Sequence, residues 1–370
     1  MRRRAVLLLA SVTIVIVMLV LVGCQYTGTL SWMPSDIANY QPPHIGEGGE
    51  VKVLTVAMFK AGDLPGASPG EAQLWIEGEK LDRVIEVPGS YSPLYCNAAK
   101  DHCLVITGMG KANAAATIMA VGLSDQVDLT KAYILVAGIA GIQPDDGTIG
   151  TATWAEWVVD GDLACEIDAS EMPANWSYPY FQLGCAEPWC DDGWTAGTEV
   201  YHLNPALTEW AYRLSRDVEL ADSEKARAYR LHYAEGTAAR RAPFVTKGDI
   251  LTSDTYWHGK MLSECGEWWT EQFTGGQGNY CMTAMEDTGT LTALSRLAAA
   301  GRVDLNRVMV LRTASDFDQP YPGQTSQQAI QADCGGYTLA IQNVYRVGSV
   351  VAQHIITHWD EWKDGVPPLQ

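Results

Sequence analysis

Hydrophobic positions in the C-terminal part of the chain predict a helix followed by a buried strand. One set recurs at close to 3.6-residue spacing: Met285, Leu291, Leu294, Leu297 and Ala298. Gly301 follows this set, as is typical where a helix ends. The next apolar run, Val308 to Leu311, is short and continuous, which indicates a strand covered on both faces in a parallel sheet.

Polar clusters flank this helix and this strand. Glu286 and Asp287 stand at the start of the helix, and Ser315 and Asp316 come just after the strand. Open α/β sheets usually bind ligands outside the carboxyl ends of their strands. We therefore expect the side chains of Glu286 and Asp316 to face one crevice.

More apolar runs, at 51–59, 103–107 and 133–137, predict further strands of the same sheet. After the second run, Gly108 and Gly110 precede an alanine-rich helix, where glycines allow a tight turn. Strands that alternate with helices indicate the α/β class. The chain shows no internal repeat and no linker-like composition between these segments.

The N-terminus has the pattern of a secretory signal. Three arginines precede an apolar run at 5–21, and a small-residue site ends at Cys24. The Leu-Val-Gly-Cys sequence resembles a bacterial lipobox, in which Cys24 becomes acylated. We interpret 1–23 as a lipoprotein signal peptide and 24–49 as a flexible tether, which places the body outside the cytoplasm on a lipid anchor. An uncleaved transmembrane anchor is the alternative, because the run nears the length that spans a bilayer.

Charge and hydropathy exclude two function classes. The chain has 44 acidic and 25 basic residues, a formal net charge of -19. An acidic body without a cluster of Lys or Arg repels polyanions, so nucleic acid is not an expected partner. Beyond the N-terminal run, no stretch approaches eighteen uninterrupted apolar residues, so a channel-type transporter is not expected.

Cysteine positions predict disulfide bonds, because an even number remains once Cys24 is set aside and the compartment is oxidising. We expect Cys96 to pair with Cys103, and Cys185 with Cys190, in two local loops. The others are left to pair in one of three ways that the sequence leaves open: Cys165, Cys265, Cys281 and Cys334. Neither Cys-x2-Cys nor histidine spacing indicates zinc, so no metal is predicted.

Five blocks along the chain resemble the purine nucleoside permease family, within the superfamily of purine nucleoside phosphorylases and nucleosidases. These blocks are TGMGKANAAATIMA, VAGIAGIQPDDGTIG, TKGDILTSDTYWHGK, MTAMEDTGTLTAL and LRTASDFDQPYPG. The resemblance implies a three-layer α/β/α sandwich with a mixed central sheet. We expect it as a single domain over 50–370, with a disulfide-bearing excursion at about 160–245. Superfamily members form dimers, trimers or hexamers, so a homo-oligomer is compatible with the resemblance.

The resemblance also implies roles for the two polar clusters. Met285 and Glu286 would hold the ribose, with the carboxylate on its 2'- and 3'-hydroxyls. Asp316, next to Ser315, would protonate purine N7 as the glycosidic bond breaks. Such an acid needs a pKa raised by burial or by a neighbouring carboxylate such as Asp318. The alternative is that the Ser-Asp pair only caps a helix or forms an Asx-turn.

The loop that binds phosphate in phosphorylases resembles Arg-x-Gly-Ser-x-Gly, and the matching segment here includes Gly138, Ile139 and Ala140. Val136 and Ile139 replace the arginine and the serine. A phosphate dianion normally needs aimed donors or a guanidinium, so this change favours hydrolysis over phosphorolysis. Backbone amides, or a distant arginine such as Arg240 or Arg241, remain the alternative.

Two further roles are left with alternatives. Tyr256 or Trp257 would stack on the purine, unless these aromatic rings fill the core beneath the loop. Nucleosidases carry a water-activating glutamate after the first strand, and the nearest acids here are Asp63 and Glu71. Each of these acids is equally compatible with a solvated loop charge.

The resulting hypothesis is an extracytoplasmic hydrolase that cleaves nucleosides of the adenosine, inosine or guanosine class without a cofactor, in nucleoside salvage. One alternative is phosphorolysis to ribose 1-phosphate. The other is a non-catalytic lipoprotein that binds nucleosides and presents them to a separate component for uptake.

Overall fold

Strands from the whole length of the body assemble into one large mixed sheet. The computed structural model describes residues 50–60, 70–190 and 192–369, and these residues belong to one compact unit. Within the described residues this sheet has 12 strands: β1 (Val53–Ala57), β2 (Arg83–Ile85), β3 (Leu94–Cys96), β4 (His102–Ile106), β5 (Tyr133–Ile142), β6 (Ala152–Trp154), β7 (Trp157–Asp160), β10 (Val200–His202), β11 (Val245–Lys247), β12 (Asp249–Thr252), β13 (Tyr280–Ala284) and β14 (Val308–Phe317). The predicted signal peptide, the tether, Cys24 and Asp63 lie outside the described residues.

The strand order places β5 at the branch point of the sheet. The main path runs β10-β7-β12-β13-β5-β1-β4-β3-β2, and β14 pairs with β5 and β6 off this path. β5 runs parallel to β1 and β14 but antiparallel to β13. The predicted mixed sheet follows from these pairings.

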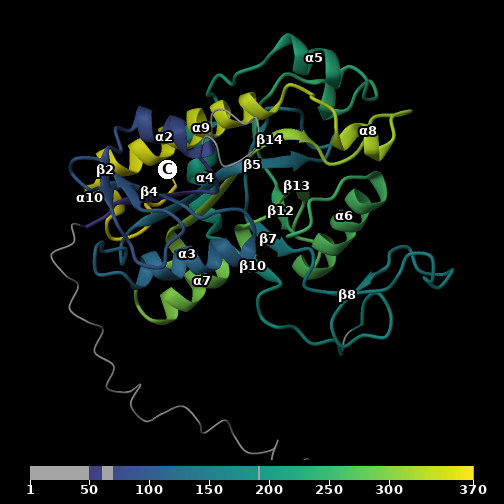
Figure 1. Ribbon diagram of the computed structural model, residues 1–370, viewed down its shortest axis with the longest axis horizontal. Coiled ribbons are helices and arrows are strands. Elements are labelled where there is room, and N and C mark those ends of the chain that lie inside the picture. The colour runs from purple at the N-terminus through teal and green to yellow at the C-terminus, as the bar shows by residue number, and fades with distance from the viewer. Residues whose placement is uncertain (1–49, 61–69, 191, 370) are drawn as a thin grey trace, which may run out of the picture. The chain divides into compact units, whose positions relative to one another are not determined.

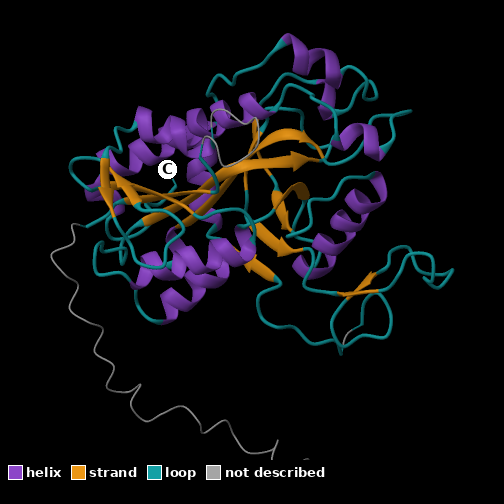
Figure 2. Cartoon of the chain, viewed as in Figure 1, coloured by secondary structure: helices purple, strands orange, loops and turns teal. Residues whose placement is uncertain are grey.

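Helices cover both faces of the sheet, which makes three layers (Figures 1 and 2). The helices and 3-10 turns are α2 (Glu71–Gly78), α3 (Lys111–Leu123), α4 (Pro205–Ser215), α5 (Glu224–Arg230), η2 (Ala238–Arg240), α6 (Lys260–Thr274), α7 (Asp287–Ala299), η3 (Leu305–Arg307), α8 (Ser326–Ile330), α9 (Tyr337–Thr357) and α10 (Trp359–Trp362). One face carries α9, which contacts β14, β5 and β1, with α2 and α4 beside it. The other face carries α3 and α7, packed against each other.

Two strands extend further than their apolar runs predict. β5 continues through Gly138 to Ile142, and β14 continues through Asp316 to Phe317. The ladder shifts register between Ala314 and Asp316, so Ser315 is an extra residue in β14. The predicted position of Ser315 and Asp316 beyond the strand is therefore wrong, and so is the capping alternative, because both residues belong to a bulged strand end.

The excursion predicted at about 160–245 begins with a separate two-stranded sheet, β8 (Cys165–Glu166) and β9 (Tyr180–Phe181). Figure 1 shows β8 at the periphery of the molecule. The chain then returns to the large sheet through β10, and α4 packs on α9 with Leu207 and Ala211 buried. The helix α4 thus serves core packing.

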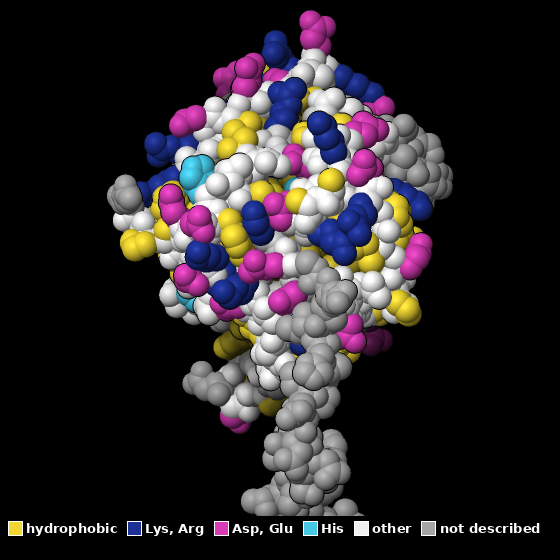
Figure 3. Space-filling view, turned by 90° about the vertical axis from the view of Figure 1, so that its left-hand side faces the viewer, with side chains coloured by type: hydrophobic (Ala, Val, Ile, Leu, Met, Phe, Trp, Pro, Cys, Tyr) yellow, Lys and Arg dark blue, Asp and Glu magenta, His cyan; other side chains and the backbone are white. Residues whose placement is uncertain are grey.

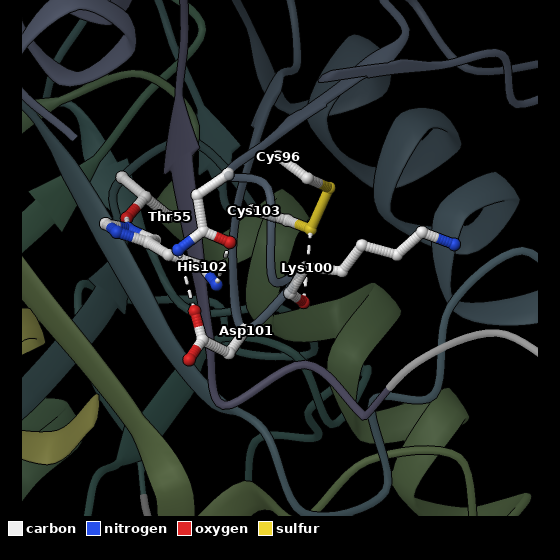
Figure 4. The surroundings of a disulfide bond; sticks show 7 residues. Thr55, Cys96, Lys100, Asp101, His102 and Cys103 are labelled. Carbon is white, nitrogen blue, oxygen red and sulfur yellow. Dashed lines mark hydrogen bonds between the residues drawn. A yellow bond between two sulfur atoms is a disulfide. The ribbon is translucent and has the colours of Figure 1, made fainter. Parts of the chain in front are cut away.

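Both predicted local disulfides are present. Cys96 and Cys103 are opposite residues of β3 and β4 (Figure 4), and Cys185 pairs with Cys190. The prediction that the other four pair is wrong, because each stands unpaired: Cys165, Cys265, Cys281 and Cys334. They have different surroundings; for example, Cys281 contacts the Thr153 hydroxyl on β6, whereas the thiol of Cys334 donates to the carbonyl of Ser315.

Surface charge is mixed on the face that Figure 3 shows, where Lys and Arg side chains stand among Asp and Glu. In the part of the chain that the structure describes, no helix is long and apolar enough to cross a bilayer.

Candidate active site

A cavity of about 450 Å³ lies where the carboxyl ends of β5 and β14 approach the start of α7. This volume is typical of small-molecule sites. The charged and polar side chains that line it are Glu71, Tyr256, Thr283, Glu286, Arg312, Ser315, Asp316, Asp333 and Tyr337. The strand-end position predicted from the sequence therefore brings Glu286 and Asp316 into one cavity.

Glu286 stands immediately before α7 and is held from two sides. One carboxylate oxygen accepts a hydrogen bond from the Gly110 amide at 3.2 Å, and the other accepts from Arg312 Nη2 at 3.0 Å. The side chain of Glu286 is only 4% exposed. A buried carboxylate needs such donors because desolvation disfavours its charge.

Arg312 organises the floor of the cavity. Its guanidinium, 1% exposed, donates to Glu286, to Asp287 at 3.0 Å and to the backbone carbonyl of Ile139 at 3.1 Å. Each of its three nitrogens is thereby engaged within the protein. The sequence offered Arg312 only as part of a motif, and its role as the shared partner of two acids was missed.

The loop that supplies the Gly110 amide is fixed by a charged cluster. Lys111 forms ion pairs with Asp160 at 3.0 Å and with Asp162, and Asp254 accepts from the Lys111 amide at 2.7 Å. These residues come from α3, the end of β7 and the loop after β12. The glycine-rich block thus contacts Glu286 through its backbone.

Glu71, the first residue of α2, reaches into the cavity floor. Its two oxygens accept hydrogen bonds from the amides of Met58 at 2.8 Å and Ile139 at 2.7 Å. Burial raises the pKa of Glu71 to about 7, against the attraction of Arg312. The interpretation of Glu71 as a solvated loop charge is wrong, because the side chain is buried.

Gly138 lets these groups approach one another. A Cβ at this position would lie 2.6 Å from Arg312 Nη1, 2.8 Å from a Glu71 oxygen and 2.8 Å from the Met58 sulfur. Contacts this short force neighbouring atoms to move. Gly138 therefore supports the cavity floor, whereas Ile139 and Ala140 line the cavity itself.

Asp316 lines the cavity at the end of β14, and in the described part of the chain no cation pairs with it. One of its oxygens accepts from the Tyr256 hydroxyl, and the other accepts from Ser315 at 2.9 Å. Burial raises the pKa of Asp316 above its ordinary value, and both donors oppose that rise. The bulge at Ser315 lets two consecutive side chains line the cavity, which a regular strand would turn to opposite faces.

Of the predicted aromatic and arginine partners, Tyr256 lines the main cavity and the other three do not. Tyr256 lines the cavity with its hydroxyl on Asp316, but Trp257 lies outside the main cavity and packs near Tyr280, as the core-filling alternative expected. Arg240 pairs with Glu235, and Arg241 lies over the Phe244 ring. Neither arginine is among the described residues that line the cavity.

Sequence reasoning missed part of the lining. The segment from Ile330 to Tyr337 forms one wall, and the Tyr337 ring stacks at 6.3 Å from that of Phe59. Asp287 supports Arg312 from α7. A glycine pair, Gly335 and Gly336, was the available signal for a close approach, since a Cβ on Gly336 would lie 2.1 Å from the Ser315 carbonyl oxygen.

Comparison with a family model identifies a match to "Purine nucleoside permease (NUP)" over residues 50–367. A probable purine nucleoside permease of Schizosaccharomyces pombe is 37% identical over 327 residues, which cover 84% of this chain and 90% of the relative. A purine nucleoside permease of Candida albicans is 34% identical, with 89% of this chain and 78% of the relative covered.

Solved structures with the same fold include nucleosidases. A Helicobacter pylori mutant enzyme with 5'-methylthioadenosine in its active site has a TM-score of 0.50 at 15% identity, covering 82% of this chain and 99% of that chain. The 5'-methylthioadenosine/S-adenosylhomocysteine nucleosidase of the same organism, in complex with a small molecule, has a TM-score of 0.50 at 16% identity and the same coverage. The predicted nucleoside phosphorylase-like sandwich is thereby confirmed as the fold.

Proposed function

Because this chain belongs to the purine nucleoside permease family, we propose that it binds purine nucleosides in this cavity and hydrolyses their N-glycosidic bond outside the cytoplasm. The observation that carries the proposal is the convergence of Glu71, Glu286 and Asp316 in one cavity with a single arginine. These acids come from three distant segments, and each has contacts suited to a different step.

Glu286 orients the sugar. Its carboxylate is fixed by Arg312 and by the Gly110 amide, which leaves lone pairs to accept hydrogen bonds from the ribose 2'- and 3'-hydroxyls. Met285 stands beside it in the lining. Holding the ribose in one pose accelerates the reaction by orientation.

Asp316 acts as general acid toward the purine. Ser315 has one hydroxyl proton, which reaches either Asp316 or the Ala140 carbonyl, 3.1 Å away. When the Ser315 hydroxyl donates to the Ala140 carbonyl, one Asp316 oxygen no longer accepts a hydrogen bond from Ser315. That oxygen can then be protonated and can donate its proton to purine N7. Proton transfer of this kind contributes roughly 10²–10⁴ in rate.

Glu71 activates the attacking water. With its pKa at about 7, near neutral pH a large fraction of Glu71 is carboxylate and can take a proton from water as that water attacks C1'. The acidic lining also favours the positive charge that develops on the ribose in the transition state.

Phosphorolysis is less well supported. Among the described lining residues, Arg312 is the one cationic side chain, and its nitrogens are already bonded to Glu286, Asp287 and Ile139. A phosphate dianion would have to displace a buried carboxylate or lie beside several of them.

A binding-only role is the second candidate, and the observation that favours it is the word permease in the names of both relatives. Such a protein would present nucleosides for uptake from a lipid anchor. The disulfides are compatible with an extracytoplasmic location.

One experiment separates these functions. Purified protein is incubated with inosine, adenosine or guanosine, with and without phosphate, and the products are identified by chromatography. We expect free base and ribose without phosphate. Release that requires phosphate would establish phosphorolysis, and saturable binding without products would establish the binding-only role.

A further inference from the structure

A second, much smaller cavity lies behind Asp316. Its volume is about 20 Å³, and it shares Gly141, Tyr256, Thr283 and Asp316 with the wall of the main cavity. Its other lining side chains include Asp318 and His258, which do not line the main cavity. A space of this size holds about one water molecule.

Two buried polar atoms beside this small cavity have no hydrogen-bond partner in the described part of the chain. They are Oδ1 of Asp318 and Nε2 of His258. The other Asp318 oxygen accepts from the Tyr280 hydroxyl and the Ser263 hydroxyl, each at 2.7 Å, and Asp318 is only 2% exposed. Leaving such buried atoms unpaired is unfavourable, so a ligand that bonds to both is favoured.

The groups around Asp318 supply little positive charge. The titratable groups that face it are Asp316, Tyr280, Asp146, Tyr233, Cys281 and His258. Burial raises the pKa of Asp318 to about 7, and repulsion from Asp316 and Asp146 adds to that rise. Burial lowers the pKa of His258, which keeps the imidazole neutral at neutral pH. Asp318 can therefore give and take a proton near pH 7, whereas neutral His258 can take a proton at one ring nitrogen as it gives one from the other.

We propose that this small cavity binds one water molecule that bridges Asp318 Oδ1 and His258 Nε2, and that it returns a proton to Asp316 after each turnover. This inference rests on the proposed hydrolase function. It assigns positioning and proton-relay roles to Asp318 and His258, behind the acid that touches the base.

The protons balance through the relay. Asp316 gives its proton to the purine and becomes a carboxylate, which then takes a proton from the bridging water. That water takes one from protonated Asp318, and Asp318 is recharged through half-buried His258, which gives the proton on Nε2 toward the cavity as Nδ1 takes one from solvent. Water and Asp318 end the cycle as they began, His258 ends as its other tautomer and is reset by rotation of its ring, and one solvent proton has entered.

The test compares Asp318→Asn and His258→Gln with the wild type. Asparagine keeps the size of Asp318 but cannot relay a proton. We expect kcat to fall about tenfold or more in each variant, a modest share of what proton transfer contributes. The KM for inosine should stay within twofold, and the basic limb of the kcat profile should move in Asp318→Asn.

Asp360→Asn is the control, because Asp360 is exposed on α10 and lines neither of these two cavities. This control should keep kcat within twofold. Circular dichroism melting checks that each variant folds. If Asp318→Asn does not fold, His258→Gln, which changes a half-buried side chain, still tests the relay. Unchanged kcat and pH profile in both relay variants would overturn the relay.

A high-resolution crystal structure of the wild type judges the water site independently of turnover. Density for a water within hydrogen-bond distance of Asp318 Oδ1 and His258 Nε2 supports the site, and a dry cavity overturns it. If the wild type binds inosine but never cleaves it, the proposed hydrolysis and the relay both fail, whereas the water site still stands or falls on that density.

Discussion

The two sides of the cavity handle acidic charge in opposite ways. On one side, at the start of α7, Arg312 forms direct ion pairs with both Glu286 and Asp287. On the other, at the end of β14, Asp316 and nearby Asp318 accept from hydroxyl donors, and no cation in the described part of the chain pairs with either carboxylate. Burial raises the pKa of Glu286 as well, but Arg312 opposes that rise and favours the charged form, which can hold a ligand, whereas a carboxylate without a cation is suited to carry a proton. The difference suggests a binding side and a chemical side.

The largest effect should come from removing the cation. Arg312→Met leaves Glu286 and Asp287 buried without their partner, which typically costs 3–5 kcal/mol. We expect the free energy of unfolding in urea to fall by about that amount, and nucleoside binding to be lost with it. Arg216→Met, at an exposed ion pair, is the control and should change stability by less than about 0.5 kcal/mol. An Arg312→Met protein of normal stability would show that the ion pairs do not hold this side together.

On the chemical side, Asp316→Asn should separate turnover from affinity. We expect kcat to fall by roughly 10²–10⁴, the usual range for a lost general acid, while the dissociation constant for inosine changes little. Steady-state kinetics and calorimetric titration measure the two quantities. Asp360→Asn, an exposed change on α10, is the control. If affinity falls as much as kcat, Asp316 belongs to the binding side, and the division into a binding side and a chemical side is wrong.

Glu71 lies near Arg312, which attracts it, and near Glu286, which repels it. As the base it must be ionised, so with its pKa at about 7 we expect turnover to fall as the pH drops below 7. Glu71→Gln should lower kcat by about a hundredfold and abolish this acidic limb. A limb that survives in Glu71→Gln would assign the base to another group.

The same group links stability to pH. The folded pKa of Glu71, about 7, exceeds its ordinary value of 4.5, so folding favours the protonated form. Its contribution to stability is present below pH 4.5 and is lost as the pH rises through 7. We expect the unfolding free energy of the wild type, relative to that of Glu71→Gln, to fall as the pH rises from 4.5 through about 7. Urea titration at several pH values measures this difference. A constant difference would contradict the burial argument.

Tyr256→Phe should have the smallest effect. The Tyr256 hydroxyl donates to Asp316 and so favours its carboxylate. Without this bond the pKa of Asp316 rises further, and more of it is protonated at a given pH. We expect the basic limb of the kcat profile to move to higher pH, with kcat changing about threefold or less. A shift to lower pH would mean that Tyr256 donates to another group during turnover.

Sequence patterns predicted what depends on periodicity and strand ends. The helix after Glu286 and the strand that begins at Val308 follow from local spacing, although that strand runs on through Asp316, and strand ends of one sheet meet at one edge. The inward turn of Glu71 depends on α2 folding back to the Met58 amide, a contact across thirteen positions that no local pattern encodes. Likewise, the unpaired state of Cys265 and Cys281 depends on spatial placement, and an even count of cysteines carries no such information.

The Cys96–Cys103 bond closes a ring of only seven positions of sequence separation, far from the branch strand β5 in the order of the sheet. A ring this small restricts the unfolded chain less than a long one does. The bond therefore acts mainly in the folded state, where it holds β3 on β4 and so keeps the β2–β3 margin of the sheet paired. A variant with Cys96→Ser and Cys103→Ser should consequently retain the main cavity, with fraying and protease nicks confined to that margin.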